Sequence, residues 1–439
     1  LEDTDVQRNV PGAEEALMED LAWLGLHWDE GPDRGGPHGP YRQSERGHLH
    51  LEAGRRGMAD GWAYPCFCSD EERAGDEVEL EGGSRFNRYP GRCRSLGIEE
   101  ARERVRRGDP HLVRFLVPDG DVEIKDEIRG SITFPRNDLD DFVILRMEGT
   151  ATYNFAVVVD DLAMAITDVI RGAGHLSNTP KQVLVYRALG RDVPRFTHLP
   201  TVLGPDRKKL SKRTGAAAVA ELRAAGFHPD AVINYLSLLG WSDPEEREVL
   251  TRSELIRAIG LDRVGASDTV FDPEKLRWLS QQHFSLMPPE DFTRAAQPFV
   301  DVARFPQDAE RLGIALRALQ SRVAVLSEVS DYLPLVFPEG REQVMAARSA
   351  LARDPDAVRV IEEVAVRLGA LERWEPQEIG AAIRSVGKDL GVRGPALFHP
   401  VRLALNAQES GPALGSVMIA IGRGEVLAAY EETLGLAEL

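Results

Sequence analysis

Three lysines lie close together in one short turn of a chain that otherwise avoids lysine. The segment Gly204–Arg213 reads GPDRKKLSKR and contains Lys208, Lys209 and Lys212. Of the 53 basic residues in the chain, only seven are lysine and 46 are arginine. An ammonium group is a compact, mobile point charge, whereas a guanidinium group is a planar fork. The bias therefore predicts a mobile loop that closes on a polyphosphate in a transition state, with a solvated basic turn as the alternative.

The cysteines form a second chemical cluster. All three, Cys66, Cys68 and Cys93, fall within 28 residues. An odd, clustered set without a secretory leader favours metal binding or reduced thiols over structural disulfides.

Length and composition indicate an ordinary globular protein. A chain of 439 residues predicts two to four domains. No apolar run is long enough to span a bilayer, and no leader precedes Leu1, which we expect to lie inside a domain. The net charge of −18 excludes wholesale coating of nucleic acid, but a local basic face remains compatible with it, such as Arg102, Arg104, Arg106, Arg107 and Arg114.

The first half of the chain alternates between strand and helix patterns. Helices are predicted over 13–28, 45–62 and 179–189, strands over 112–118, 121–134, 141–145, 156–159 and 165–170, and a loop over 69–90. This order predicts a parallel α/β sheet with an antiparallel insertion. At its carboxyl edge, Asp160, Asp161 and Arg171 would line a cleft with the lysine turn.

Beyond residue 215 the strand signals fade. Helical spacing of apolar residues predicts helices over 227–241, 252–260, 273–283, 308–329, 355–369, 376–390 and 413–435. The second half is therefore predicted to be an all-helical module with its own core.

Several segments together resemble the bacterial glutamyl-tRNA synthetases, class I aminoacyl-tRNA synthetases that charge tRNA with glutamate. Lys209–Arg213 is similar to the KMSKS loop of that class, and Leu1–Asp5 is similar to the family's R-I-E-D-T-D. The other matching segments, in the family's order, are Gly39–Arg46 (GPYRQSER), Thr152–Asp161 (TYNFAVVVDD), Ser177–Pro180 (SNTP) and Phe271–Trp278 (FDPEKLRW).

The resemblance implies an α/β plus all-α fold in four parts. These are a Rossmann-like catalytic domain (1–65 and 142–215), an inserted acceptor-binding α/β subdomain (66–141), a helical stem-contact region (216–278) and an α-helical anticodon-binding domain (279–439). In the family an opening strand and the HIGH motif precede R-I-E-D-T-D. We therefore expect this chain to be the larger part of a longer protein.

The resemblance also assigns the substrate residues. Glu2 should pair with the ammonium group of glutamate, while Tyr153 and Arg171 should hold carboxylate oxygens. Lys212, supported by Lys209 and Ser211, should stabilise the triphosphate of ATP as the glutamate carboxylate attacks the α-phosphate. His175 is also expected at the ATP site, where the family's R-G-E-D-H reads RGAGH here, with Ala173 and Gly174 in place of two acids.

The cysteine spacing resembles the zinc knuckle that some bacterial members carry in the acceptor-binding insertion. Thiolates favour tetrahedral Zn²⁺, and Tyr89 stands at the family's fourth-ligand position, although tyrosine is a poor ligand. The resemblance implies a structural Zn²⁺ held by Cys66, Cys68, Tyr89 and Cys93. An empty, reduced site is the alternative.

Two C-terminal segments resemble those that read the anticodon. Arg402 would hydrogen-bond to an unstacked base edge, and Pro412 and Leu414 would stack against a base. Gly415 stands where an aromatic residue often sits, and an ordinary helix-capping loop is the alternative reading.

Together these features predict a cytoplasmic, monomeric enzyme that ligates L-glutamate to tRNA(Glu), with ATP and Mg²⁺ and without a membrane. Whether tRNA for glutamine is also charged stays open. The rival readings are a non-catalytic tRNA-binding paralogue and a glutamyl transferase that modifies a tRNA anticodon base. The transferases lack the anticodon module, so residues 280–439 argue against the second rival.

The lysine turn yields a first testable prediction. Replacing Lys212 with alanine should slow adenylate formation at least about a hundredfold, because the transition-state charge on the triphosphate loses a donor. The affinity for tRNA should barely change. Pyrophosphate exchange and tRNA binding measure the two effects, and equal activity of wild type and variant would remove Lys212 from its assigned role.

Overall fold

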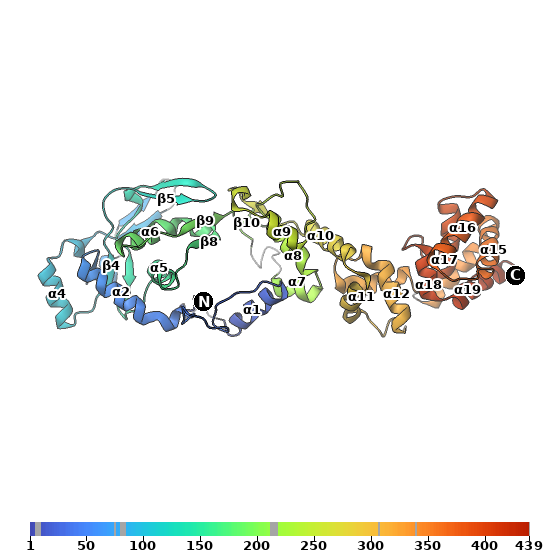
Figure 1. Cartoon of the computed structure of the whole chain (residues 1–439), viewed down its shortest axis with the longest axis horizontal. Coiled ribbons are helices and arrows are strands. Elements are labelled where there is room, and N and C mark those ends of the chain that lie inside the picture. Colours follow the sequence, from blue (N-terminus) through green and yellow to red (C-terminus); the bar gives the residue numbers. More distant parts are fainter. Residues whose placement is uncertain are drawn as a thin grey trace. The chain divides into compact units, whose positions relative to one another are not determined.

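The structure, a computed structural model, describes residues 1–4, 10–73, 76–79, 85–210, 218–305, 308–338 and 340–438. The chain forms two compact units, and each is described by itself (Figure 1). Unit 1 contains Leu1–Ala216, Ser237–Arg247 and Leu255–Phe271, and unit 2 contains Ala217–Leu236, Glu248–Glu254 and Asp272–Leu439. Within the described ranges, no helix is long and apolar enough to cross a membrane.

A four-stranded mixed sheet is the centre of unit 1. Its order is β6-β5-β9-β8, with bounds β5 Val122–Asp126, β6 Gly130–Phe134, β8 Asp168–Gly172 and β9 Arg195–Leu199. Strands β8 and β9 run parallel in register from Asp168↔Arg195 to Gly172↔Leu199, and β5 joins β9 in parallel at Asp126↔Phe196. Strand β5 comes from the range predicted for the insertion and β9 from the predicted catalytic range, so one sheet crosses that boundary. The four domain ranges themselves stay a prediction.

A second, antiparallel sheet and two small pairs complete the strands. The three-stranded sheet has the order β1-β4-β7, with β1 Ala63–Cys66, β4 Leu112–Phe115 and β7 Val143–Leu145. Strands β2 Asp76–Glu79 and β3 Arg85–Arg88 form a hairpin, and β10 Val202–Leu203 pairs with β11 Thr269–Val270. The loop predicted over 69–90 therefore contains the short helix α3 (Asp70–Arg73) and a hairpin, which local composition did not reveal.

Unit 1 contains the helices α1 Ala13–Trp23, α2 Gly47–Asp60, α4 Ile98–Arg107, α5 Tyr153–Ala163 and α6 Thr179–Ala188. Of these, α2, α5 and α6 pack against the sheets. Helices α5 and α6 pack together, and α6 lies on β5 (Figure 1). One core runs through both sheets and these helices, and its members include Phe115, Ile124, Ile144, Phe155, Val185 and Phe196.

One strand prediction was wrong. The apolar run 156–159 was expected to be a buried strand, but it lies inside helix α5. Its three consecutive valines favour strand locally. Phe155, Ala156 and Val159 are nevertheless buried together at helical spacing against the core. Tertiary burial of this face outweighs the β preference of the valines, which is worth less than about 1 kcal/mol per residue.

Beyond residue 218 the described chain is mainly helical, as predicted, with the short strand β11 as an exception. The helix predicted over 308–329 was too long, because α12 ends at Leu319 and 3₁₀ segments follow it. The bounds are α7 Val219–Ala225, α8 Pro229–Leu238, α9 Arg252–Ala258, α10 Pro273–Leu286, α11 Pro289–Ala296, α12 Ala309–Leu319, α13 Val329–Tyr332, α14 Arg341–Leu351, α15 Pro355–Gly369, α16 Pro376–Leu390, α17 Pro395–Asn406, α18 Leu414–Ile421 and α19 Arg423–Ala437. Helix α15 shows why these segments form helices. Asp354 caps its N-terminus by accepting from the Asp356 backbone N–H, Pro355 occupies the first turn, and Val360, Ile361 and Val364 repeat along the buried face.

The single helix predicted over 413–435 is two helices. Gly422 lies between α18 and α19 with φ 97° and ψ 144°, a left-handed conformation that glycine tolerates and that ends α18. The apolar pattern continues on both sides of the break, because both helices pack on the same core through Val417 and Val426. Periodicity alone therefore could not locate the interruption.

A buried histidine caps helix α8 in unit 2. The Asp230 backbone N–H donates to His228 Nδ1 at 3.1 Å, and the His228 backbone N–H donates to Ser280 Oγ at 3.2 Å. The ring of His283 on α10 lies 5.4 Å from that of His228, centroid to centroid. Burial, together with the nearby His283, lowers the pKa of His228 to about 4. A neutral Nδ1 is required, because a protonated Nδ1 could not accept the capping bond.

This cap predicts acid sensitivity. The pKa of His228 is lower in the folded chain than in the unfolded chain, so its stabilising contribution is complete above pH 6.5 and is lost as the pH falls towards 4. Asparagine can also cap a helix but does not titrate. His228→Asn should therefore remove up to about 3 kcal/mol of the decline in unfolding free energy between pH 7 and 4.

Urea unfolding at several pH values measures this decline, and His48→Asn, at an exposed position of α2, is the matched control. Parallel pH profiles of wild type and His228→Asn would contradict the prediction.

Candidate functional site

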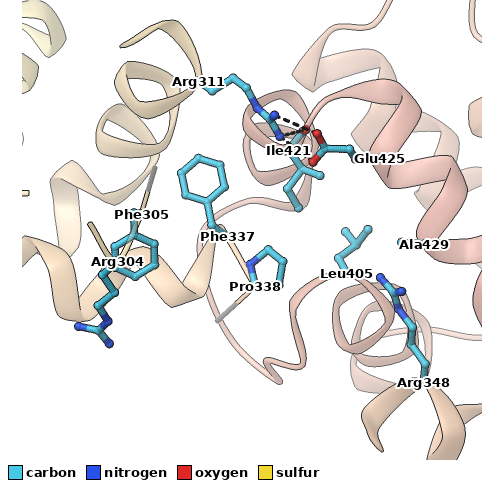
Figure 2. Close-up of a pocket in the computed structure, with 10 residues that line it drawn as sticks. All are labelled: Arg304, Phe305, Arg311, Phe337, Pro338, Arg348, Leu405, Ile421, Glu425 and Ala429. Carbon is cyan, nitrogen blue, oxygen red and sulfur yellow. Dashed lines mark hydrogen bonds and ion pairs between the residues drawn. The ribbon is translucent and has the colours of Figure 1, made fainter. Parts of the chain in front are cut away.

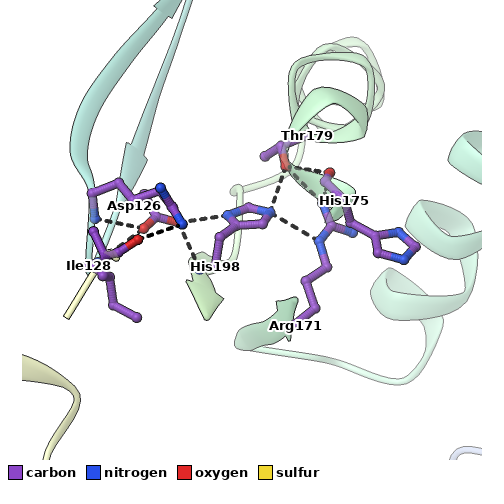
Figure 3. Close-up of polar contacts among 8 residues, drawn as sticks. Asp126, Ile128, Arg171, His175, Thr179 and His198 are labelled. Carbon is purple, nitrogen blue, oxygen red and sulfur yellow. Dashed lines mark hydrogen bonds and ion pairs between the residues drawn. The ribbon is translucent and has the colours of Figure 1, made fainter. Parts of the chain in front are cut away.

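Arg171 is held in place on strand β8 by three neighbours. Its Nε–H donates to His198 Nε2 at 3.2 Å, and its Nη2 donates to Thr179 Oγ1 at 2.8 Å and to the His175 carbonyl at 3.4 Å (Figure 3). His198 belongs to the adjacent strand β9, and Thr179 begins helix α6. The sheet register that places Arg171 opposite His198 thus fixes where the guanidinium can lie.

Tyr153 and His175 meet beside this guanidinium. Tyr153 is the first residue of α5, and His175 lies in the 3₁₀ segment Ala173–Asn178 that follows β8. The Tyr153 hydroxyl and His175 Nδ1 are 3.1 Å apart, and the ring centroids are 5.8 Å apart. A residue predicted to bind glutamate and one predicted to bind ATP are therefore in direct contact.

Glu2 belongs to the same electrostatic neighbourhood. Burial raises the pKa of Tyr153, and the charge of Glu2 raises it further. Burial lowers the pKa of Arg171, against the opposing charges of Tyr153, Asp161 and Glu2. Burial also raises the pKa of Asp161 to about 6, with contributions from Asp160 and Glu2. The charge of the exposed Glu2 thus acts on both Tyr153 and Arg171, which are themselves half-buried.

The segment Tyr41–Ser44 positions Glu2. The Gln43 backbone N–H donates to the Leu1 carbonyl at 2.9 Å, and the Leu1 backbone nitrogen donates to the Tyr41 carbonyl at 2.7 Å. The Ser44 backbone N–H and hydroxyl donate to the two oxygens of Asp3 at 2.8 and 2.6 Å. Two segments that the sequence analysis matched separately are therefore one structural unit.

Buried polar residues anchor this segment to α5, and Asp160, which was expected to line a cleft at the end of a strand, is one of them. Asp160 accepts from Arg46 Nε at 2.7 Å, from Gln43 Nε2 at 2.8 Å and from His50 Nε2 at 2.8 Å. Burial alone would raise the pKa of Asp160, but the bonds from His50, Gln43 and Arg46 outweigh it and lower the pKa. The signal was present in the sequence, because Gln43, Arg46 and Asp160 all lie in segments matched to the family.

The lysine turn is a tight hairpin in the part that the structure describes. Gly204 N–H donates to the Lys208 carbonyl at 2.8 Å, and Leu210 N–H donates to the Val202 carbonyl at 3.0 Å. Lys208 and Lys209 are exposed on it. Ser211 and Lys212, which were predicted to be catalytic, lie outside the described residues, so their roles stay predictions.

The predicted metal ligands are brought together. The three sulfur atoms of Cys66, Cys68 and Cys93 all lie within 4.8 Å of one another. The Tyr89 hydroxyl is 3.3 Å from Cys66 Sγ and 3.5 Å from Cys68 Sγ. Strand β1 ends at Cys66, and Cys93 lies in a 3₁₀ turn, so residues 27 positions apart in the chain face one centre.

Arg114 supplies a buried cation beside this cluster. It was grouped with exposed arginines from the sequence, but it lies on β4 with 6% of its surface exposed. Its guanidinium carbon is 3.6 Å from the Tyr89 ring centroid, and its Nη1 donates to the Asp141 carbonyl at 2.6 Å. Burial alone would raise the pKa of Cys66, but hydrogen bonds from Tyr89 and Arg114 lower it, whereas burial raises the pKa of Cys68 to about 11.

The predicted anticodon residues lie together in unit 2, but they face inward. Arg402 is 7% exposed, and its Nη2 donates to the Pro412 carbonyl at 2.6 Å. Leu414 is also 7% exposed, and Pro412 is buried. An added side chain at Gly415 would collide with the Pro376 carbonyl at 2.4 Å, which explains the absence of an aromatic residue there. Base contacts by Arg402, Pro412 and Leu414 stay a prediction.

Unit 2 also contains a cavity of about 240 Å³ that the sequence analysis did not foresee (Figure 2). Its wall combines apolar side chains with three arginines, Arg304, Arg311 and Arg348. Each arginine is already paired: Arg304 with Asp331 at 3.3 Å, Arg311 with Glu425 at 2.7 Å, and Arg348 with Glu432. The positive charges of this cavity are thus neutralised within the protein.

Comparisons with known proteins agree over nearly the full length. Residues 1–278 match the class I tRNA synthetase (E and Q) catalytic domain, and residues 291–434 match an anticodon binding domain. A glutamate–tRNA ligase of Sulfurihydrogenibium sp. (strain YO3AOP1) is 39% identical over 423 residues, covering 96% of this chain and 88% of the relative. One from Desulforudis audaxviator (strain MP104C) is 41% identical over 436 residues, covering 97% and 87%.

Among solved structures, a glutamate tRNA ligase from Elizabethkingia meningosepticum in complex with its amino acid superposes with a TM-score of 0.82. The two chains are 29% identical, and the match covers 99% of this chain and 91% of the other.

Proposed function

Because this chain belongs to the glutamate–tRNA ligases, a family of class I tRNA synthetases, we propose that it joins L-glutamate to tRNA(Glu). Its fold is the class I synthetase catalytic fold followed by a helical anticodon-binding domain. ATP and glutamate form glutamyl-adenylate with release of pyrophosphate. The glutamyl group then passes to a hydroxyl of the terminal adenosine of the tRNA, and AMP leaves. The proposal extends to Mg²⁺ with the ATP and to a monomer working in the cytoplasm, as the family resemblance implies.

The observation that carries the proposal is the match to several glutamate–tRNA ligases over at least 96% of the chain. The site geometry supports it. Glutamate presents one ammonium and two carboxylate groups, and the chain offers the half-buried guanidinium of Arg171 and hydroxyl of Tyr153, together with the exposed acid Glu2, whose charge acts on both. Low local polarity strengthens the contacts of the two half-buried groups.

The nucleotide is proposed to lie next to the amino acid. His175, assigned to ATP, contacts Tyr153, assigned to glutamate, through a 3.1 Å hydrogen bond. Lys212, supported by Lys209 and Ser211, would close over the triphosphate and stabilise the charge that develops there as the α-phosphate is attacked. Ala173 and Gly174 leave the loop between Arg171 and His175 without the family's two acids.

The two rival functions are not favoured. A glutamyl transferase that modifies an anticodon base would lack the module that residues 291–434 match. A non-catalytic tRNA-binding paralogue would have no reason to keep Glu2, Tyr153 and Arg171 in one electrostatic neighbourhood.

Glutamate-dependent ATP–pyrophosphate exchange with tRNA present tests the proposal. The full-length wild-type protein should catalyse exchange with glutamate. Arg171→Lys keeps the charge but loses the planar fork, so KM for glutamate should rise about a hundredfold while KM for ATP stays nearly constant. No exchange by the wild type would favour the non-catalytic paralogue, and an unchanged KM for glutamate in the variant would remove Arg171 from the glutamate site.

The cysteine cluster is proposed to hold one structural Zn²⁺. Tetrahedral Zn²⁺ with Zn–S bonds of about 2.3 Å needs sulfur atoms about 3.8 Å apart, and the Cys68 and Cys93 sulfurs are 3.5 Å apart. Three thiolates around Zn²⁺ leave one net negative charge. The buried guanidinium of Arg114 would balance that charge.

Metal analysis tests this site. Purified protein should contain close to one equivalent of zinc, and Cys68→Ser should lose most of it together with thermal stability, because metal binding and folding are coupled. Tyr89→Phe tests whether Tyr89 is a zinc ligand. If this variant loses zinc, Tyr89 is a ligand, and if it keeps zinc, Tyr89 only forms hydrogen bonds to the thiols. Tyr64→Phe, which loses only a bond to Asp141, is the control. Less than a small fraction of an equivalent in the wild type would leave the thiols without a metal.

A further inference from the structure

A buried carboxylate–imidazole pair lies directly behind Arg171. The side chains of Asp126 and His198 are both fully buried, and Asp126 Oδ2 is 2.7 Å from His198 Nδ1. Asp126 ends strand β5, His198 lies on β9 and Arg171 lies on β8, so the chain of contacts crosses three neighbouring strands (Figure 3). Neither Asp126 nor His198 was singled out by the sequence, and Asp126 has no role in the site as described so far.

Among the described residues, the Asp126 carboxylate accepts its hydrogen bonds from N–H donors. Oδ1 accepts from the backbone N–H groups of Ile128 and Arg129 at 3.1 and 2.8 Å, in the turn between β5 and β6. Oδ2 accepts from the His198 backbone N–H at 3.0 Å as well as from the ring. Burial alone would raise the pKa of Asp126, but these bonds outweigh it and lower the pKa, so the group is an anion that can only accept.

These contacts determine the tautomer of His198. Because Asp126 can only accept, His198 Nδ1 must carry a proton. On the opposite side of the ring, Arg171 Nε–H can only donate, and it points at His198 Nε2 from 3.2 Å. Nε2 must therefore present its lone pair. The ring is the neutral Nδ1–H tautomer, and burial together with the charge of Arg171 lowers the pKa of His198 in keeping with this.

A second contact fixes the other edge of the same guanidinium. Thr179 Oγ1 accepts from Arg171 Nη2 at 2.8 Å and lies 3.0 Å from His198 Nε2 and 3.4 Å from the His175 carbonyl. A guanidinium is a rigid plane, so anchoring Nε and Nη2 sets the direction of the whole group. The Nε anchor depends on a correctly oriented imidazole, and the Thr179 hydroxyl lies within hydrogen-bond distance of the same imidazole.

We infer that Asp126 and His198 are positioning residues for the amino-acid substrate: Asp126 selects the tautomer of His198, and His198 aims the guanidinium of Arg171 at a substrate carboxylate. The inference rests on the proposed role of Arg171 in binding glutamate. It assigns a function to β5, a strand from the range predicted for the acceptor-binding insertion. The pair touches no reacting atom, so its effect should appear in glutamate binding and leave ATP binding unaltered.

Two substitutions of His198 separate its contact with Asp126 from its contact with Arg171. In His198→Asn, the side-chain amide can still donate to Asp126 from a position near Nδ1, but it is too short to reach Arg171. In His198→Gln, the longer amide can offer its oxygen near the position of Nε2, but the bond to Asp126 is lost. We expect His198→Asn to raise KM for glutamate about ten- to a hundredfold, with KM for ATP within about twofold of wild type.

His198→Gln should raise KM for glutamate at least several-fold less than His198→Asn does, although it loses more thermal stability, because the Asp126 carboxylate then lacks a buried donor. Equal KM values for the two variants, or larger effects of His198→Gln on both measures, would overturn the inference. If His198 has a purely structural role, the less stable variant should also bind glutamate more weakly. If His198 positions Arg171, the less stable variant, His198→Gln, should bind glutamate more tightly than His198→Asn.

Thr179 provides a second pair if a His198 variant does not fold. Thr179→Ser keeps the hydroxyl and Thr179→Val removes it at nearly equal volume, so KM for glutamate should rise about tenfold more in the valine variant. Nitrogen-15 NMR of histidine-labelled wild-type protein reads the tautomer directly, and a protonated Nε2 on His198 would refute the arrangement. If the wild type shows no glutamate-dependent exchange, the proposed function fails, while the NMR result still decides the tautomer.

Discussion

The buried charge of Asp160 is the constraint on which the site depends. Its carboxylate and the guanidinium of Arg46 have 6% and 2% of their side-chain surface exposed, and they meet at 2.7 Å. Removing one partner from a buried ion pair costs about 3–5 kcal/mol, because the other charge is left without compensation. Gln43 and His50 satisfy the rest of the carboxylate. Helix α5 and the segment 41–46 must therefore stay together, and Leu1–Thr4 is bonded to that segment.

A second buried carboxylate, Asp126, also organises the site through hydrogen bonds. It is bonded to the ring of His198, and the same ring accepts a hydrogen bond from Arg171. Asp160 holds the elements that carry Glu2 and Tyr153, and Asp126 holds the side chain of Arg171. The pKa values of the adjacent carboxylates Asp160 and Asp161 shift in opposite directions because their neighbours differ. The hydrogen-bond donors around Asp160 lower its pKa, whereas burial and neighbouring acids raise the pKa of Asp161 to about 6.

Much of the architecture follows from local pattern. Helices α15 and α16 have the bounds expected from apolar spacing, because a capping acid or a proline marks their starts and the buried faces repeat regularly. The valine run of α5 and the break at Gly422 were missed. In the first case long-range burial overrides a local β preference, and in the second one backbone angle interrupts an otherwise continuous pattern. Arg114 was grouped with a basic surface but is buried. The number of charges in a segment does not reveal that this guanidinium packs against the ring of Tyr89.

By itself, the sequence determined the family, because short motifs keep their order and chemistry along the chain. It also predicted residues for binding glutamate and zinc. Tertiary structure alone decided which of these residues share a space. Strands β5, β9 and β8 come from distant parts of the chain, yet they place Asp126, His198 and Arg171 in line. The physical reason is that a hydrogen bond depends on distance and donor geometry across strands, and neither quantity is encoded in the spacing of residues along one strand.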